Sequence, residues 1–124
     1  MVKLKQVMKM EKTDDDVSKI ASGAIKYDSG KPCTYRGVVQ YFPRAVTAVA
    51  EISTFGASKY AWAGWEKVDD GVARYSDAMM RHLFKEGAGE EFDDDSGLMH
   101  AAHAAWGALA RLELILREKE NKSE

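Results

Sequence analysis

A dense group of carboxylates lies in the second half of the chain, where residues 90–95 read Glu-Glu-Phe-Asp-Asp-Asp. Carboxylate oxygens are preferred ligands of hard divalent cations, and Mg²⁺ is usually held by one or two of them together with substrate phosphates. Glu90 and Asp93 have the spacing that puts two carboxylates on one face of a helical turn, and Asp95 and His100 could reach the same region. Acidic side chains are also favoured near a helix N-terminus by the helix dipole, so the pattern leaves both interpretations open.

Basic side chains lie just before the acidic segment. Arg74, Arg81 and His82 could bind phosphate oxygens, because guanidinium groups match phosphate geometry and a histidine can donate a hydrogen bond. An exposed basic helix face would give the same pattern. His100 and His103 are spaced like the two histidines of a helical metal pair, but that spacing is common and each is more often a packing residue.

A short aromatic and basic group is found further upstream, at Lys59, Tyr60, Trp62 and Trp65. Such a group is suited to stacking on a nucleobase and contacting phosphate. Aromatic residues near a helix end are also used to cover a hydrophobic core, so this group alone does not establish a binding site.

Three helices are expected to position these residues. The first begins at Pro43, a favoured residue of the first helical turn, and continues through Phe55, with Gly56 near its end. The second runs over 72–86, with its apolar side expected to be buried at Met79, Met80, Leu83 and Phe84. The third runs over 97–117, with Ser96 as its N-cap.

The third helix has two kinds of surface. An aliphatic stripe, which should supply core contacts, consists of Leu98, Leu109, Leu112 and Leu116. A stripe of small residues would allow another backbone to approach closely, and consists of Ala101, Ala104, Gly107 and Ala108. We therefore expect a homo-oligomer, a dimer or a tetramer, built partly on this helix.

The remaining segments carry weaker signals. Residues 1–40 should form a largely irregular N-terminal extension, residues 35–41 have the only alternation suggestive of a strand, and residues 118–124 form a polar tail that should fray. With 124 residues, the chain falls in the size range of one domain. The predicted fold is therefore a single all-α domain, a small helical bundle.

Composition restricts the function classes. The chain has 18 basic and 20 acidic residues, a net charge of −2, so no broad nucleic-acid surface is expected. No segment reaches the roughly 20 apolar residues of a membrane helix, and the first residues lack the apolar core of a secretory signal. A lone cysteine, Cys33, agrees with a reducing compartment. We expect a cytoplasmic protein without a membrane partner.

Four blocks of residues, in order along the chain, resemble the phage dATP/dGTP diphosphohydrolases, which are similar to the all-α nucleoside triphosphate pyrophosphohydrolases of the MazG type. The blocks are residues 26–32, KYDSGKP; residues 55–60, FGASKY, followed by Trp65; Arg74-Tyr75 with Arg81-His82-Leu83; and Gly89-Glu90, Asp93, Asp95-Ser96-Gly97, His100 and His103-Ala104. The family usually has Asn where this chain has Gly64, and often Glu at Asp95.

The resemblance implies hydrolysis of dGTP and dATP between the α and β phosphates, to the monophosphate and pyrophosphate, with Mg²⁺ or Mn²⁺. The implied metal ligands are Glu90, Asp93, Asp95 and His100. Glu51, with Glu90 and Asp93, is the implied catalytic set, Glu51 acting as a facing ligand or general base. The implied substrate-binding residues are Lys31, Lys59, Tyr60, Trp65, Arg74, Arg81 and His82.

Two other functions are compatible with the residues. A phage nucleotide kinase is disfavoured, because Gly30-Lys31 is followed by Pro32 and lacks the earlier glycine of a phosphate-binding loop. The second alternative is a non-catalytic module that binds a nucleotide or a host protein through the aromatic group and the basic helix.

Overall fold

The computed structural model describes residue 23 and residues 25–123 of the chain, which divide into one unit that ends at Tyr41 and a second that starts at Phe42. In the first unit a turn at residues 28–31 is followed by one short π-helix, Tyr35–Val39. The alternation over residues 35–41 therefore does not form a strand. The amide of Gln40 donates to the carbonyl of Tyr35 at 2.8 Å, which is a hydrogen bond within one helical turn. In a strand, these backbone groups would instead pair with a neighbouring strand.

The second unit is built on three α-helices, α3 over Pro43–Lys59, α4 over Gly71–Gly87 and α5 over His100–Ser123. The first two match the predicted helices within four residues at each end, with Pro43 in the first turn of α3 as expected. The all-α prediction is confirmed. None of the helices in the described part of the chain is long and apolar enough to cross a membrane.

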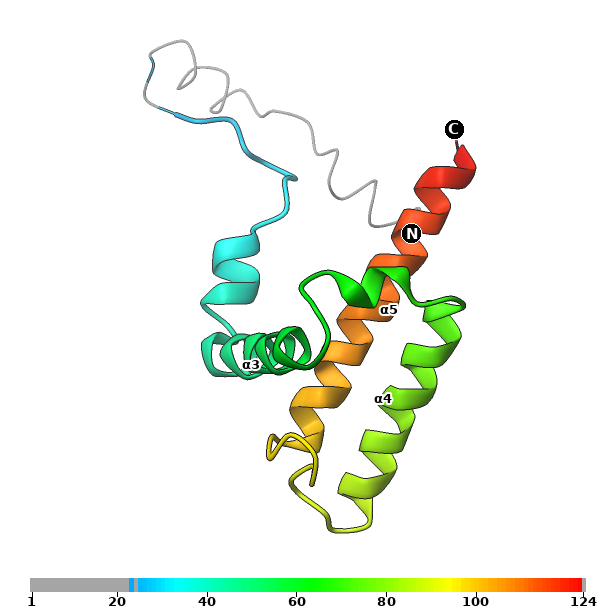
Figure 1. The fold of residues 1–124 in the computed structure, drawn as a ribbon. Helices are drawn as coiled ribbons and strands as arrows, with labels where there is room; N and C mark the ends of the chain where they lie inside the picture. Colours follow the sequence, from blue (N-terminus) through cyan, green and yellow to red (C-terminus); the bar gives the residue numbers. More distant parts are fainter. Residues whose placement is uncertain (1–22, 24, 124) are drawn as a thin grey trace. The chain divides into compact units, whose positions relative to one another are not determined.

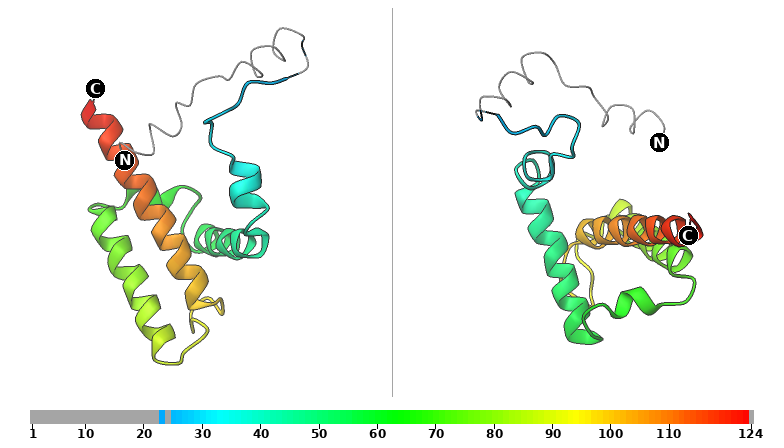
Figure 2. Two further views of the ribbon diagram at one scale, coloured as in Figure 1. Left: turned by 180° about the vertical axis from the view of Figure 1, so that it is seen from behind. Right: turned by 90° about the horizontal axis from the view of Figure 1, so that it is seen from above.

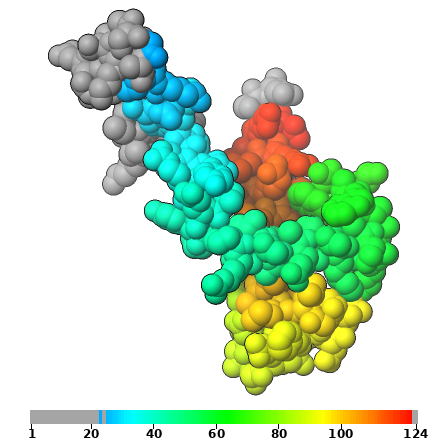
Figure 3. Space-filling model, turned by 90° about the vertical axis from the view of Figure 1, so that its left-hand side faces the viewer, coloured from blue at the N-terminus to red at the C-terminus, as the bar shows by residue number. Residues whose placement is uncertain are grey.

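The helices α4 and α5 run antiparallel, side by side, while α3 crosses α5 on another side (Figures 1 and 2). A short 3₁₀ helix, Gly64–Lys67, lies in the connection between α3 and α4. The segment that joins α4 to α5, yellow in the space-filling view, lies beyond α3 at one end of this unit (Figure 3).

The third helix differs from its prediction at both ends. It begins at His100 because Gly97 has a φ of +71°, in the left-handed region, which ends any helical path before residue 98. Ser96 is consequently not an N-cap: its hydroxyl contacts the His103 ring and accepts from the amide of Leu98. The tail expected to fray is helical as far as Ser123.

Close backbone approach between α4 and α5 explains the small residues of α5. A Cβ built on Gly107 would lie 3.1 Å from the Cβ of Met79, and Ala104 and Ala110 are buried. Two of the four small residues expected at a subunit interface, Ala104 and Gly107, therefore lie within the buried part of this chain, whereas Ala101 and Ala108 are exposed.

Large apolar side chains remain on the surface, contrary to the predicted core. On α4, Met80, Leu83 and Phe84 are exposed, and on α5 the leucine stripe at 109, 112 and 116 is exposed too. The expected burial is wrong for these six positions, because α4 and α5 meet along a narrow seam of small residues that the periodicity of the larger side chains does not mark.

Gly107→Leu is expected to destabilise the second unit by about 1–3 kcal/mol, because forcing a large side chain against Met79 outweighs the roughly 1 kcal/mol gained in helix propensity. Thermal unfolding followed by circular dichroism measures the effect. Ala108→Leu, at an exposed neighbouring position of α5, is the matched control and should stay within about 0.5 kcal/mol of the parent. An unchanged or raised Tm in Gly107→Leu would contradict the close helix contact.

Candidate active site

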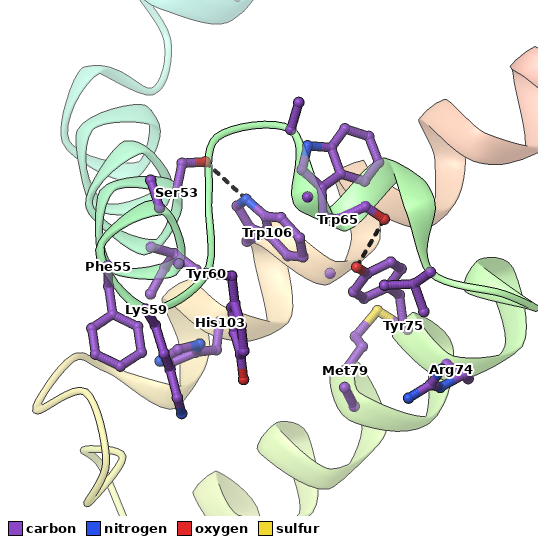
Figure 4. Close-up of a pocket in the computed structure, with 18 of the residues that line it drawn as sticks. Ser53, Phe55, Lys59, Tyr60, Trp65, Arg74, Tyr75, Met79, His103 and Trp106 are labelled. Atoms are coloured by element: carbon purple, nitrogen blue, oxygen red, sulfur yellow. Dashed lines mark hydrogen bonds between the residues drawn. The ribbon is translucent and has the colours of Figure 1, made fainter.

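A cavity of about 680 Å³ lies between α3, the connection from α3 to α4, α4 and α5 (Figure 4). Its volume falls in the range of small-molecule sites, which is roughly 300–1,000 Å³. It combines aromatic, basic and histidine side chains, and those used below are Ser53, Lys59, Tyr60, Trp62, Trp65, Arg74, Tyr75, Arg81, His82, His103 and Trp106.

Three aromatic rings form one wall of this cavity. Trp65, Tyr75 and Trp106 contact one another edge to face, with ring centroids 5.5 to 6.4 Å apart. Hydrogen bonds fix two of the rings: the Trp106 indole donates to the Ser53 hydroxyl at 2.9 Å, and the Tyr75 hydroxyl donates to the Trp65 carbonyl at 2.9 Å (Figure 4). The wall is therefore held in place before any ligand binds.

Burial raises the pKa of the Tyr75 phenol, so Tyr75 stays a neutral hydrogen-bond donor. By contrast, Tyr60 and Trp62 are 77% and 71% exposed, which leaves much of each ring accessible to a flat ligand. The cavity thus has a rigid aromatic wall and accessible rings near it.

Basic side chains line the other parts of the cavity. Lys59 comes from the end of α3, and Arg74 and Arg81 come from α4, two turns apart. The Lys59 ammonium is 2.6 Å from an Asp95 carboxylate oxygen, and this hydrogen bond holds the pKa of Lys59 above its usual value. The pair joins the end of α3 to the acidic segment.

The acidic segment folds back on itself rather than forming a helical turn. Phe92 and Met99 make an antiparallel bridge, the Asp93 amide donates to the Leu98 carbonyl at 2.8 Å, and the Gly97 amide returns a bond to the Asp93 carbonyl at 2.8 Å. The left-handed Gly97 permits this reversal. The fold-back brings Asp93 next to the first turn of α5, where His100 and His103 lie.

Four side chains meet at this point. The Nδ1 atoms of His82 and His100 are 2.8 Å apart, and the other ring nitrogen of His100 is 2.6 Å from a Glu90 carboxylate oxygen. Ligand atoms of His82, Asp93 and His100 all lie within 4.8 Å of one another, a spacing that could hold a metal ion. We call these three residues the His-Asp cluster. His100 in this cluster is completely buried.

Neighbouring groups fix the charge state of the cluster. Burial, and then the nearby His103, lower the pKa of His82 to about 4, so its ring is neutral at pH 7. Partial burial raises the pKa of Asp93, but hydrogen bonds from the Ser96 amide and hydroxyl outweigh it, so the pKa is lowered and the carboxylate is ionised. Neutral imidazole and ionised carboxylate are the forms that bind metals.

His103 borders the cluster without joining it. Its ring stacks on His82 at a centroid distance of 4.4 Å, while its Nε2 lies 2.7 Å from the Ser96 hydroxyl. The spacing of His100 and His103 left a metal pair on one helix open, whereas the structure brings His100 together with His82 across two helices. His82 also lines the cavity and so connects it to the cluster.

A comparison with protein families matches residues 21–124 to the family described as "dATP/dGTP diphosphohydrolase, N-terminal". The chain belongs to this family. The predicted membership is confirmed, and the match covers all the residues of the cavity and the cluster.

One relative of this family member is the dATP/dGTP diphosphohydrolase of Salmonella phage PMBT28, which is 35% identical over 85 residues. The aligned region is 68% of this chain but only 27% of the phage protein, so the chain spans about a quarter of that relative's length. No solved structure matches this chain.

Six of the seven predicted substrate-binding residues of this family member line one cavity, namely Lys59, Tyr60, Trp65, Arg74, Arg81 and His82. The seventh, Lys31, lies in the other unit, where its amide donates to the carbonyl of Asp28 at 3.1 Å. Lys31 as a phosphate ligand stays a prediction.

The predicted metal ligands are divided among different contacts. Asp93 and His100 lie in the His-Asp cluster. Glu90 contacts the Nε2 atom of His100, and Asp95 pairs with Lys59. Glu51 lines a pocket of about 150 Å³ with Phe92, Leu98 and Met99, and it is not among the residues that line the larger cavity. Its role as a base or facing ligand stays a prediction.

Sequence reasoning did not select Tyr75, Trp106 and Ser53 as site residues. Trp106 is the largest side chain in a stretch, residues 101–110, that otherwise consists mostly of alanine and glycine, and this contrast was the available signal. Ser53 carried no such signal, because its role depends on α3 crossing α5.

Proposed function

We propose that this chain hydrolyses purine deoxynucleoside triphosphates, dGTP and dATP, to the monophosphate and pyrophosphate with the help of a divalent metal ion. The observation that carries the proposal is a nucleotide-sized aromatic and basic cavity joined through His82 to the His-Asp cluster. Membership in a family named for dATP/dGTP diphosphohydrolases supports it.

The aromatic part of the cavity suits the base and sugar. A purine can stack on an accessible ring such as Tyr60 or Trp62, and stacking on aromatic side chains is typically worth about 1–3 kcal/mol per base. The Trp65–Tyr75–Trp106 wall is already hydrogen-bonded internally, so it contributes shape and apolar contact rather than additional polar recognition.

The basic and histidine part suits the triphosphate. Arg74 and Arg81 can donate paired hydrogen bonds to phosphate oxygens, and Lys59 adds a charge near them. Asp93 and His100 offer one ionised oxygen and one imidazole nitrogen to a divalent ion. When bound, such an ion would activate the attacking water and offset charge that develops on the phosphate oxygens. The site would therefore align the α phosphate with the cluster.

Arg81→Ala is expected to weaken dGTP binding about tenfold or more, while binding of deoxyguanosine changes less than about twofold, because the guanidinium acts on phosphate. Calorimetry with a non-hydrolysable dGTP analogue and with deoxyguanosine measures both affinities. Arg36→Ala, which alters an exposed arginine of the first unit, is the control. Equal losses for the two ligands would contradict a phosphate role for Arg81.

Incubation with dGTP and a divalent cation, followed by chromatography, separates this function from the two alternatives. The proposal predicts dGMP and pyrophosphate. Phosphate transfer to an added nucleoside monophosphate would indicate a kinase, and intact dGTP that nevertheless binds the protein would indicate a non-catalytic module.

We also propose a homo-oligomer. Its interface would lie on the leucine stripe of α5 rather than on the stripe of small residues that the sequence suggested. The exposed stripe of Leu109, Leu112 and Leu116 is an apolar face that a second subunit could cover, as in a four-helix arrangement. We expect light scattering to give at least a dimer at micromolar concentration, and Leu112→Glu to shift it to the monomer. Phe84→Glu, at an exposed apolar position of α4, is the control. A monomeric parent protein would contradict the proposal.

A further inference from the structure

The His-Asp cluster has an unusual donor set for an enzyme expected to use Mg²⁺. We infer that it binds a first-row transition-metal ion, such as Mn²⁺, Co²⁺ or Zn²⁺, in preference to Mg²⁺, with His82 as a ligand rather than a phosphate-binding residue. Glu90 then acts as a positioning residue that orients His100. The inference rests on the proposed function only for the catalytic role of the ion, because binding of the ion can be measured without turnover.

The distance between the two histidines agrees with a shared ion. Bonds from such an ion to histidine nitrogen are about 2.0–2.1 Å, so two bound nitrogens lie about 2.9 Å apart at the right angle of octahedral coordination and about 3.3 Å apart at the tetrahedral angle that zinc prefers. The Nδ1 atoms of His82 and His100 are 2.8 Å apart, and an Asp93 oxygen completes a set within 4.8 Å. Three donors from α4, the connecting segment and α5 thus converge on one point.

The contact of Glu90 with His100 has the arrangement common around histidine ligands. When the Nε2–H of His100 donates to Glu90, at 2.6 Å, its Nδ1 carries the lone pair and faces the Nδ1 of His82. His100 is completely buried, so this orientation is held by packing as well as by the carboxylate. Glu90 is 44% exposed at its side chain and lies on the far side of the ring from the cluster.

The donor types discriminate between ions. Mg²⁺ takes oxygen ligands and loses its water molecules reluctantly, whereas imidazole suits later divalent ions, whose affinity generally rises from manganese toward copper. Two of the three donors in the cluster are imidazole nitrogens. Mg²⁺ can still reach the site bound to the triphosphate, which requires no protein nitrogen.

The competing explanation is a hydrogen bond between the two rings, with one Nδ1–H donating to the other Nδ1. That arrangement satisfies both nitrogens without an ion. It predicts that His82 contributes nothing to metal affinity, and direct binding measurements therefore decide between the two.

The test is titration of the metal-free full chain with Co²⁺, followed by calorimetry and visible absorption, without nucleotide. We expect one tight site per chain, d–d absorption bands that change on binding, and an affinity for Mg²⁺ at least about 100-fold lower. His82→Ala should weaken Co²⁺ binding at least tenfold and Glu90→Gln by about tenfold or more. His103→Gln, which replaces the histidine outside the cluster, should change it less than threefold.

A second measurement needs no variant: pulsed electron paramagnetic resonance of the Mn²⁺-loaded parent protein should show coupling to histidine nitrogen. Unchanged Co²⁺ affinity in His82→Ala, equal affinities for Mg²⁺ and Co²⁺, or no nitrogen coupling would each overturn the inference. Failure of the proposed function looks different, because the protein would then bind Co²⁺ through His82 yet leave dGTP intact.

Discussion

Asp93→Asn is expected to lower the rate of dGMP formation from dGTP by about 100-fold or more. Asp93 is the one carboxylate in the His-Asp cluster, and an amide keeps its shape but loses the charge that a divalent ion requires. Initial rates at saturating and at low dGTP show whether the loss lies in kcat. Because Asp93 also accepts a hydrogen bond from the Ser96 amide at 2.9 Å, circular dichroism must show that the variant is folded.

The matched control for Asp93→Asn is Glu91→Gln, which removes one exposed carboxylate of the same segment. It should leave the rate within about twofold, since only the backbone carbonyl of Glu91 contacts His100. A folded Asp93→Asn protein with near-normal turnover would show that the acidic segment serves only to shape the loop.

Removal of divalent metal is expected to abolish turnover, to below about 1% of the initial rate. Without an ion, the ionised Asp93 would repel a triphosphate that approaches the cluster, and nothing would offset the charge developing on the phosphate. Dialysis against excess chelator, followed by dGTP hydrolysis assays, measures the loss. Addition of Mn²⁺ should restore the rate.

Circular dichroism before and after chelation provides the control, because α3, α4 and α5 are connected by contacts outside the cluster, such as the bond from Trp106 to Ser53. Full turnover in excess chelator, with the protein still folded, would contradict the metal requirement outright.

The helices were predictable because local signals agree with tertiary packing. Pro43 marks the start of α3, and the glycines at 87 and 89 end α4 near the expected position. The pattern of buried residues was not predictable from the sequence. The helices α4 and α5 approach so closely at Gly107 that small residues occupy their contact, and larger residues such as Phe84 lie outside it. Periodicity shows which residues share a face, and the partner helix decides which face is buried.

The site was predictable in its residue types but not in its pairings. Spacing along the chain suggested His100 with His103, whereas the structure pairs His100 with His82, eighteen residues away. That pairing depends on the antiparallel α4 and α5, and on the reversal at Gly97 that delivers Asp93 to the same point. Asp95, which the sequence suggested as a ligand, pairs with Lys59, and its role as a metal ligand stays a prediction.

We propose that water cleaves a purine triphosphate between its α and β phosphates at the His-Asp cluster. Phosphorus NMR of a reaction of dGTP in ¹⁸O-labelled water, with Mn²⁺ present, tests it most directly. We expect dGMP and pyrophosphate as the only phosphorus products, with one ¹⁸O atom incorporated per dGTP cleaved. Three results would contradict this reaction: formation of dGDP and inorganic phosphate, formation of deoxyguanosine and inorganic triphosphate, or products without ¹⁸O.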